Sequence, residues 1–175
     1  SPRPPRLAHW RLPASPIILE GMGQHAHSHH ELAGADLVAE AARALSAKGE
    51  QWTSMREAVF AELARHERPV SAYDIADNLS AARGKRVAPN SVYRILDLFV
   101  SNNLAMRVES ANAYLANTHP GCAHDCIFLV CDECGEAAHV DDEAVSRAVR
   151  AIAAARDFRA ERPVLEIRGL CKACA

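Results

Sequence analysis

The stretch PNSVYRILDLFVSNNLAMRVESANAYLA, residues 89–116, decides the fold of this chain. Pro89 suits the first turn of a helix, because the N–H that proline lacks is not needed there. Two strand-like runs, 104–109 and 113–116, follow and are separated by the turn residues 110–112. Apolar residues at helical spacing predict one buried face on the helix, formed by Val92, Ile95, Leu96 and Phe99. We therefore expect a helix followed by a β-hairpin.

Three further helices are predicted upstream of this stretch. The first spans 32–48 and ends before Gly49, which fits the left-handed position after a helix C-terminus. The second begins near Thr53, and the third begins after Ser71, whose hydroxyl can cap a helix. Helices followed by a β-hairpin, in this order, are typical of a winged helix-turn-helix domain, which we place at 31–116.

Charge is distributed unevenly along the chain. The net charge is −2, yet residues 52–107 carry eight basic and six acidic side chains, whereas 108–175 carry seven and eleven. A local basic surface can bind DNA phosphates even when the whole chain is weakly acidic. We predict such a surface from basic residues that no acid interrupts, namely Arg83, Lys85, Arg86 and Arg94. Residues 83–86 alone would also fit a solvated loop.

In a winged helix-turn-helix, the helix that begins at Pro89 would enter the major groove of double-stranded DNA. Ser91, Tyr93 and Arg94 lie off its predicted core face. We expect Arg94 to contact a phosphate or a guanine edge, since a guanidinium can donate two hydrogen bonds to guanine. Two positions fit Tyr93 equally well: a contact in the groove, or a ring packed under the hairpin.

Four cysteines form two C-x-x-C pairs, Cys131 with Cys134 and Cys171 with Cys174. Each pair offers two thiolates from one tight turn, and Gly135 supplies the left-handed position that such a turn often needs. The spacing predicts a tetrahedral zinc site. Four protein ligands leave no position for water or substrate, so we expect a structural site and not a catalytic one. Two redox motifs or two disulfides are the alternatives.

The last third of the chain alternates strand and helix. Residues 127–130 and 164–167 are apolar runs that lead to the two cysteine pairs, and 144–152 has the spacing of an amphipathic helix. We predict a small α/β dimerisation domain over 126–175, stapled by the zinc ion. Its partner would be a second copy of the chain, because DNA half-sites are usually read by two-fold dimers. The overall fold class is then α+β.

The N-terminal residues differ in composition from the rest. Five prolines lie within 1–21, and four histidines lie within 25–30. We predict a disordered, histidine-rich leader over 1–30, either a solvated tail or an accessory metal-binding arm. The sequence shows neither a signal-peptide segment nor a run of about 20 apolar residues, so we expect a cytoplasmic protein that does not associate with membranes.

Several motifs resemble those of the ferric uptake regulator family. They are Thr53-Ser-Met-Arg56, Ser71-Ala-Tyr-Asp-Ile75, Ser91-Val-Tyr-Arg94 and the two cysteine pairs. The zinc uptake regulator branch is most similar, on Val108-Glu-Ser-x-Asn112-x-Tyr114 and Gly169-Leu-Cys-x-x-Cys174. The resemblance implies a dimeric bacterial repressor, not an enzyme, that binds operator DNA when zinc fills a regulatory site and so shuts off zinc import genes. It further implies that the four cysteines bind structural zinc and that Tyr73 and Arg94 contact bases.

The resemblance also implies a second zinc ion at a hinge between the domains, which we place at 117–125. This sequence departs from the family there, because Met106 and Asn117 stand where ligands are usual. Nearby imidazole and thiol groups suit zinc. We therefore expect a regulatory site formed by His119, Cys122, His124 and His139, and two zinc ions per subunit.

Two other functions stay open on the sequence alone. An iron- or peroxide-sensing regulator of the same family would share the fold, although thiols near the hinge favour zinc over iron. A zinc buffer that binds no DNA would use only the histidines and cysteines. A zinc hydrolase is disfavoured, because the sequence has no H-E-x-x-H motif.

Overall fold

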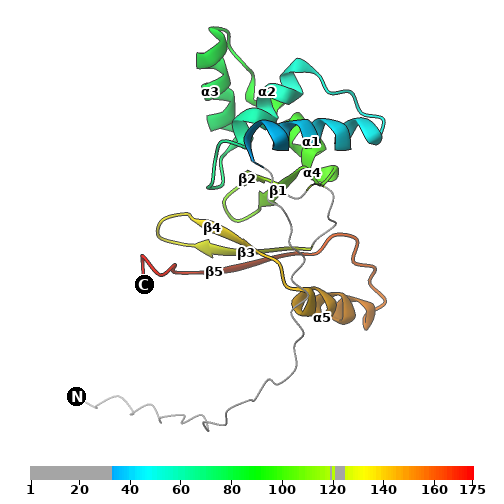
Figure 1. Ribbon diagram of the computed structural model, residues 1–175. Coiled ribbons are helices and arrows are strands. Elements are labelled where there is room, and N and C mark those ends of the chain that lie inside the picture. Colours follow the sequence, from blue (N-terminus) through cyan, green and yellow to red (C-terminus); the bar gives the residue numbers. More distant parts are fainter. Residues whose placement is uncertain (1–32, 119, 121–124) are drawn as a thin grey trace, which may run out of the picture.

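The computed structural model describes residues 33–118, 120 and 125–175. It confirms the predicted α+β fold, in which four helices and a hairpin precede a three-stranded sheet with one helix. Figure 1 shows the helical part above the hairpin and the sheet below it. The predicted leader, residues 1–30, lies outside the described residues. No helix in the described ranges is long and apolar enough to cross a membrane.

The N-terminal helices are α1 (Gly34–Ala47), α2 (Ser54–Leu63), α3 (Ala72–Arg83) and α4 (Pro89–Ser101). Two of them, α2 and α3, begin at the predicted capping residues. The Thr53 side chain accepts a hydrogen bond from the first turn of α2, and Ser71 caps α3 in the same way. Gly49, with φ of 81°, follows α1 in the left-handed conformation. Local chemistry therefore sets the starts of α2 and α3 and the end of α1.

The apolar face of α4 forms the centre of the helical core. Val92, Leu96 and Phe99 are completely buried, whereas Ile95 is only half-buried. Phe99 meets Phe60 of α2 edge to face, with 5.4 Å between the ring centroids. This packing fixes α4 against its neighbours and leaves its opposite face exposed.

The hairpin, which we call the wing, joins β1 (Ala105–Val108) to β2 (Ala113–Ala116) in antiparallel register. Its turn includes Asn112, whose φ of 46° is one that asparagine adopts more readily than most residues. Val70 and Tyr114 exchange two backbone hydrogen bonds, of 3.0 and 2.9 Å, so the segment before α3 is bridged to the wing. Helix, turn, helix and wing thus form one connected unit.

The C-terminal sheet has the strand order β4–β3–β5, from β4 (Ala137–Val140), β3 (Cys126–Cys131) and β5 (Val164–Gly169). β3 pairs antiparallel with β4 and parallel with β5, and α5 (Glu143–Ala154) lies between β4 and β5 in the chain. The predicted strands and helix are present and extend one or two residues further. The pattern did not predict β4, because Ala-Ala-His-Val is short and half alanine.

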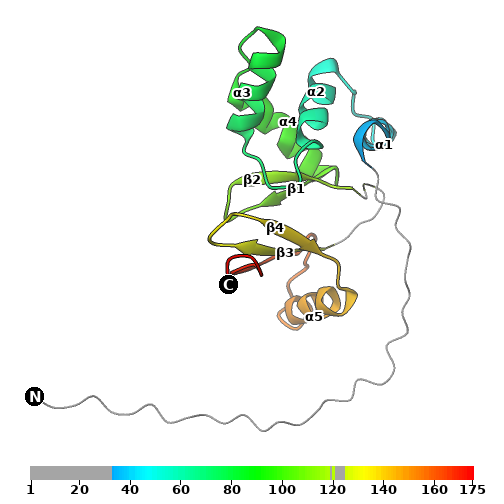
Figure 2. The same ribbon diagram turned by 60° about the vertical axis from the view of Figure 1, so that its left-hand side comes forward.

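The wing packs on one face of this sheet (Figure 2). The contact is a buried apolar cluster, formed by Met106, Val108 and Leu115 of the wing and Phe128, Val130 and Ala137 of the sheet. Beside it, Arg162 Nη1 donates to the Val100 carbonyl oxygen at 2.6 Å. The helical part and the sheet are therefore joined by both apolar and polar contacts.

Candidate functional site

Strand pairing brings the two C-x-x-C pairs together. Cys131 ends β3, and its register partner on β5 is Gly169, two residues before Cys171. Each pair lies in a tight turn: Gly135, with φ of 72°, donates to the Cys131 carbonyl at 3.0 Å, and Cys174 donates to the Cys171 carbonyl at 2.9 Å. The parallel β3–β5 ladder therefore delivers two turns, forty residues apart, to one end of the sheet.

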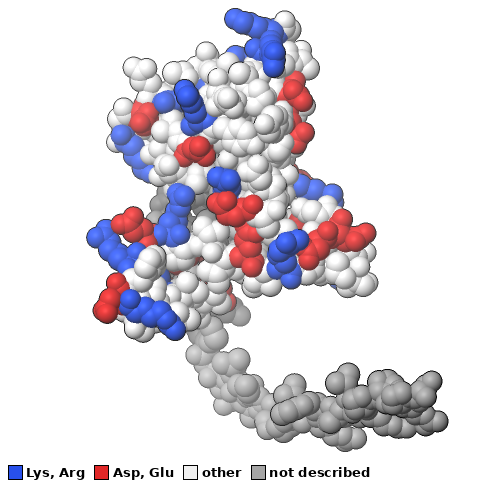
Figure 3. Space-filling view, turned by 180° about the vertical axis from the view of Figure 1, so that it is seen from behind, with Lys and Arg blue, Asp and Glu red and all other residues white. Residues whose placement is uncertain are grey.

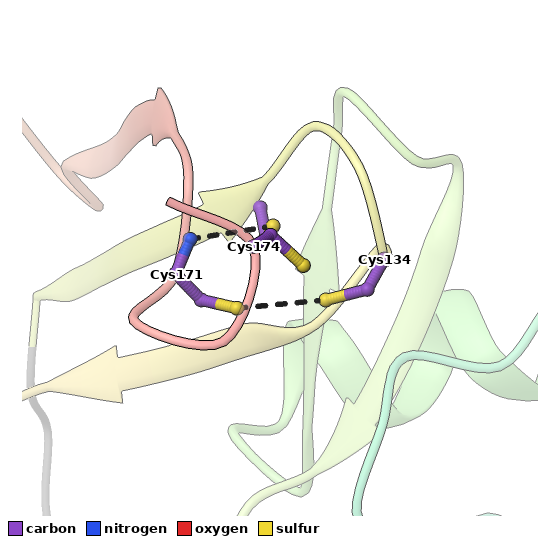
Figure 4. Close-up of side chains that lie close together, drawn as sticks. Cys134, Cys171 and Cys174 are labelled. Atoms are coloured by element: carbon purple, nitrogen blue, oxygen red, sulfur yellow. Dashed lines mark hydrogen bonds between the residues drawn. The ribbon is translucent and has the colours of Figure 1, made fainter.

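The four thiols have the spacing of a tetrahedral metal site. Their sulfur atoms all lie within 4.8 Å of one another. Zn–S bonds of about 2.3 Å place the sulfur atoms of a tetrahedron about 3.8 Å apart, and Cys134 Sγ lies 3.8 Å from Cys171 Sγ. Figure 4 shows the side chains of Cys134, Cys171 and Cys174 gathered together. All four cysteines are free thiols and form no disulfide with one another.

The electrostatics of the cluster also suit a cation. Backbone N–H groups of Cys134 and Cys171 lower the pKa of the Cys131 thiol to about 6. Neighbouring thiols, Cys171 first, raise the pKa of Cys174 to about 12. Four adjacent thiolates would repel one another, so without a cation the cluster keeps protons near neutral pH. A bound divalent cation would replace those protons.

The expected hinge ligands are only partly described. His119, Cys122 and His124 lie outside the described residues. His139 is half-buried on β4, with its ring centroid 5.5 Å from that of Phe128. Among described residues, the four cysteines are the one group of three or more candidate ligand side chains that lie close enough to share a metal ion.

Met106 and Asn117, the two departures from the family pattern, have structural roles. Met106 is buried in the cluster between wing and sheet. Asn117 is also buried, and its Nδ2 donates to the Asn103 carbonyl at 2.8 Å, which ties the end of β2 to the turn after α4. At the other end of the segment 117–125, buried Asp125 accepts hydrogen bonds from Arg150 of α5.

The predicted DNA-contacting side chains lie on the helical part. Ser91 and Arg94 are exposed on α4, and 58% of Tyr73 is exposed at the start of α3. The exposed turn after α3 carries Lys85 and Arg86. Figure 3 shows basic side chains at the upper end of the molecule, where α3 leads into this turn. The arrangement presents positive charge beside the exposed face of α4.

Some of the predicted DNA-contacting residues, among them Arg83 and Tyr93, also make contacts within the chain. The Arg83 guanidinium donates to the Ser54 carbonyl oxygen at 3.3 Å, so it braces α3 on the start of α2. The half-buried ring of Tyr93 packs by the wing, where its hydroxyl accepts a hydrogen bond from Asn112 Nδ2 at 3.3 Å. Of the two positions that the sequence left open for Tyr93, the structure has the ring packed beside the wing.

Sequence reasoning missed the polar residues that link the wing to its surroundings. Asn112 and Arg107 hydrogen-bond to each other at the wing, and Glu166 reaches the wing turn from β5. An asparagine at a predicted hairpin turn was a signal for local structure, but nothing in the sequence pairs it with Tyr93. Glu166 lies in an ordinary alternating strand and carries no signal.

Comparisons with known proteins support a regulator of metal uptake. The model of the Ferric uptake regulator family matches residues 47–168. The Zinc uptake regulation protein of Escherichia coli (strain K12) is 30% identical over 140 residues, which cover 79% of this chain and 81% of that protein.

Two solved structures are similar across most of both chains. The zinc uptake regulator complexed with zinc and DNA has a TM-score of 0.72 and 29% identity, and the match covers 78% of this chain and 91% of that one. The crystal structure of holo XcZur has a TM-score of 0.68 and 35% identity, and the match covers 78% of this chain and 94% of that one.

Proposed function

Because this chain belongs to the ferric uptake regulator family, whose members are transcription regulators and not enzymes, we propose that it is a zinc-responsive repressor of zinc uptake genes. It would bind double-stranded operator DNA as a homodimer. The observation that carries the proposal is the combination of Arg94 exposed on α4, beside the exposed basic turn of Lys85 and Arg86, with a four-thiol cluster at zinc distances. The match to a zinc uptake regulator complexed with zinc and DNA supports it.

In the proposed complex, α4 lies in the major groove. Arg94 and Ser91 face the base edges or phosphates, and Tyr73 approaches from the start of α3. Arg83, Lys85 and Arg86 would add phosphate contacts that fix the register without reading sequence. Two subunits would place their α4 helices about 34 Å apart, one turn of B-DNA.

The two proposed zinc sites have different tasks. Cys131, Cys134, Cys171 and Cys174 form a closed shell that holds the C-terminal part together. A second site would use His139 of β4 with His119, Cys122 and His124 of the hinge. Because the hinge continues directly from β2 of the wing whereas His139 lies on the sheet, one ion bound by both would fix the winged domain relative to the sheet. By linkage, zinc and DNA would then strengthen each other's binding by the same factor.

Metal content separates this proposal from an iron or peroxide sensor of the same family. We expect two zinc ions per subunit and no iron, because the proposed ligand sets are rich in thiol and imidazole groups. The measurement is native mass spectrometry with elemental analysis, after growth in media containing both metals. Iron at the second site would contradict the proposal. A single zinc ion per subunit, measured in excess zinc, would show that the proposed regulatory site does not bind zinc.

A homodimer is proposed because the C-terminal part leaves an apolar surface uncovered in the single chain. Ala138, Leu129 and Ile167 are register neighbours across β4, β3 and β5, and all three are exposed. Helix α5 buries none of its residues, and Ile152 on it is 60% exposed. Contiguous apolar surfaces of this kind mark interaction sites. A second copy of the chain would cover both.

Replacing Ile167 by aspartate should convert the dimer to a monomer. A carboxylate in the centre of the interface would lose its hydration without a partner, and we expect dimerisation to weaken by about 100-fold or more. Light scattering after size exclusion measures the mass directly. Ala39→Asp, which adds the same charge on the exposed side of α1, is the matched control and should stay dimeric. A dimeric Ile167→Asp variant would place the interface elsewhere.

A further inference from the structure

A carboxylate of the C-terminal sheet caps the turn of the wing. Glu166 on β5 accepts hydrogen bonds from the backbone N–H groups of Glu109 and Ser110, the latter at 3.1 Å. Glu166 pairs in register with Phe128, so its side chain leaves the sheet on the face that packs against the wing. The contact joins segments more than fifty residues apart, on opposite sides of the proposed hinge.

The charge state of Glu166 suits this contact. Burial alone would raise the pKa of its carboxyl, but donors at Ser110 and Glu109 and the positive charge of Arg168 lower it overall. The carboxylate therefore stays ionised at neutral pH and makes charge-assisted hydrogen bonds, which are stronger than neutral ones. The residues of the wing turn are exposed, and the strands that carry it are only four residues long.

The wing turn in turn contacts α4. Asn112 Nδ2 donates to the Tyr93 hydroxyl at 3.3 Å, while Asn112 Oδ1 accepts from Arg107 Nη2 at 3.1 Å. The Arg107 guanidinium also lies 5.8 Å from the centroid of the Tyr114 ring. Both polar atoms of the Asn112 amide therefore have partners, and the amide positions the hydroxyl of Tyr93.

Tyr93 reaches the surface proposed to bind DNA. Its ring meets the ring of Tyr73 at 5.8 Å between centroids and an angle of 82°, an edge-to-face contact. Tyr73 is the exposed member of the pair, and Arg94 is the next residue along α4. A contiguous set of contacts therefore runs from β5 through the wing turn to the start of α3.

We propose that Glu166 is a positioning residue for DNA recognition, which acts through Asn112 and Tyr93 on the placement of Tyr73. The proposal rests on the proposed function, because it assigns Tyr73 to the DNA interface. It explains how the placement of the C-terminal sheet reaches a base-contacting side chain without a metal ligand on the wing. The wing position where the family has a ligand is occupied here by buried Met106.

The contact itself is tested in the free, zinc-loaded, full-length protein by hydrogen–deuterium exchange. Glu166→Ala should accelerate exchange of the amides at 109 and 110, since their acceptor is removed. Glu161→Ala is the matched control, because Glu161 pairs only with exposed Arg159 among the ion pairs of this region. Unchanged exchange in Glu166→Ala would overturn the proposal whether or not the protein binds DNA.

The effect on recognition is tested with a duplex selected from a random pool by the zinc-loaded wild type. Glu166→Ala should weaken binding to this duplex by about 2- to 30-fold, the range of couplings between contiguous residues. Binding to an unselected duplex of equal length should stay unchanged, as should zinc content and dimer mass. An equal loss on both duplexes would show a general structural defect and overturn the proposal.

A double-mutant cycle decides whether Asn112 carries the effect. Asn112→Gly removes the amide while keeping a residue that readily adopts φ of 46°. If the two residues act in series, the affinity of the double variant for the selected duplex should equal that of whichever single variant binds less tightly. Losses that multiply would overturn the relay. Failure of the wild type to select any duplex would instead refute the proposed function, and the exchange result would still judge the contact.

Discussion

Replacing Cys174 by serine is expected to release the zinc ion from the four-cysteine cluster and to unfold the C-terminal part of the chain. A serine hydroxyl stays protonated at neutral pH, so the variant loses one anionic ligand of four. Structural zinc sites in small domains contribute about 10–16 kcal/mol of apparent binding free energy, which is also folding free energy. The C-terminal part depends on it, because its own core is small.

That small core is visible in the burial of single residues. Phe128 is the one completely buried large side chain of the described C-terminal sheet, and α5 buries none. The wing covers one face of the sheet, while Leu129 and Ile167 on the other face stay exposed. Without metal, the β3 and β5 ends keep the backbone hydrogen bond from Asp132 to Gly169 and the exposed ion pair of Arg168 with Asp132, but lose the four-ligand cross-link between the two turns. The helical part has its own aromatic core and should stay folded.

Zinc content by mass spectrometry and thermal unfolding followed by circular dichroism check this expectation. Cys174→Ser should retain one zinc ion fewer per subunit and should lose the C-terminal unfolding transition, with the helical signal largely kept. Ala175→Ser adds a hydroxyl next to the cluster and removes no thiol, so it should behave as wild type. A Cys174→Ser protein with full zinc content and an unchanged melting temperature would contradict the structural role.

The helical half and the cysteine turns could be predicted from the sequence because their signals are local. Capping by Thr53 and Ser71, and the spacing of Val92, Leu96 and Phe99, each lie within a few residues. The cysteine pairs were also predictable, since two pairs of thiols at C-x-x-C spacing are typical of a zinc site. The structure then brings the two pairs together through a parallel strand pairing that the sequence does not specify.

The contacts between the two halves could not be predicted, because they join distant segments of ordinary composition. From the sequence, Met106 was notable only because it stands where the family has a metal ligand. Its apolar packing against the sheet depends on the fold. Glu166 is a polar residue whose partners depend on how the wing sits on β5. Within the helical half, the pairing of Asn112 with Tyr93 likewise depends on where the wing turn meets α4. β4 was missed because alanine gives a weak strand signal. Of the proposed regulatory ligands, the structure describes only His139.

Replacing Arg94 by alanine is expected to weaken operator binding strongly while leaving both zinc sites filled. Arg94 is exposed on the face of α4 opposite the core residues Val92 and Phe99, and it is the next residue in the sequence after Tyr93. A bidentate arginine contact to guanine contributes about 1–3 kcal/mol of discrimination. A dimer makes the contact twice, so we expect affinity to fall by about thirtyfold or more.

Arg65→Ala is the matched control for Arg94→Ala. Arg65 also belongs to the helical part, is 79% exposed and pairs only with Glu62 of its own helix end. Its loss removes the same charge, so it should lower affinity slightly and equally on all duplexes. If Arg94→Ala bound the selected duplex as tightly as Arg65→Ala does, α4 would not be the recognition helix. If the protein were a zinc buffer that binds no DNA, the wild type and both variants would show the same lack of duplex binding.

The most direct test of a zinc-responsive repressor is DNA affinity as a function of the second zinc ion. Protein with its four-cysteine cluster loaded is titrated with zinc in the presence of the selected duplex, and binding is followed by fluorescence anisotropy. We expect affinity to rise about 5- to 150-fold as the second ion binds, the usual range of coupling between two sites. Arg94→Ala should take up the same zinc without this rise. Wild-type affinity that is the same before and after the second ion binds would contradict the account.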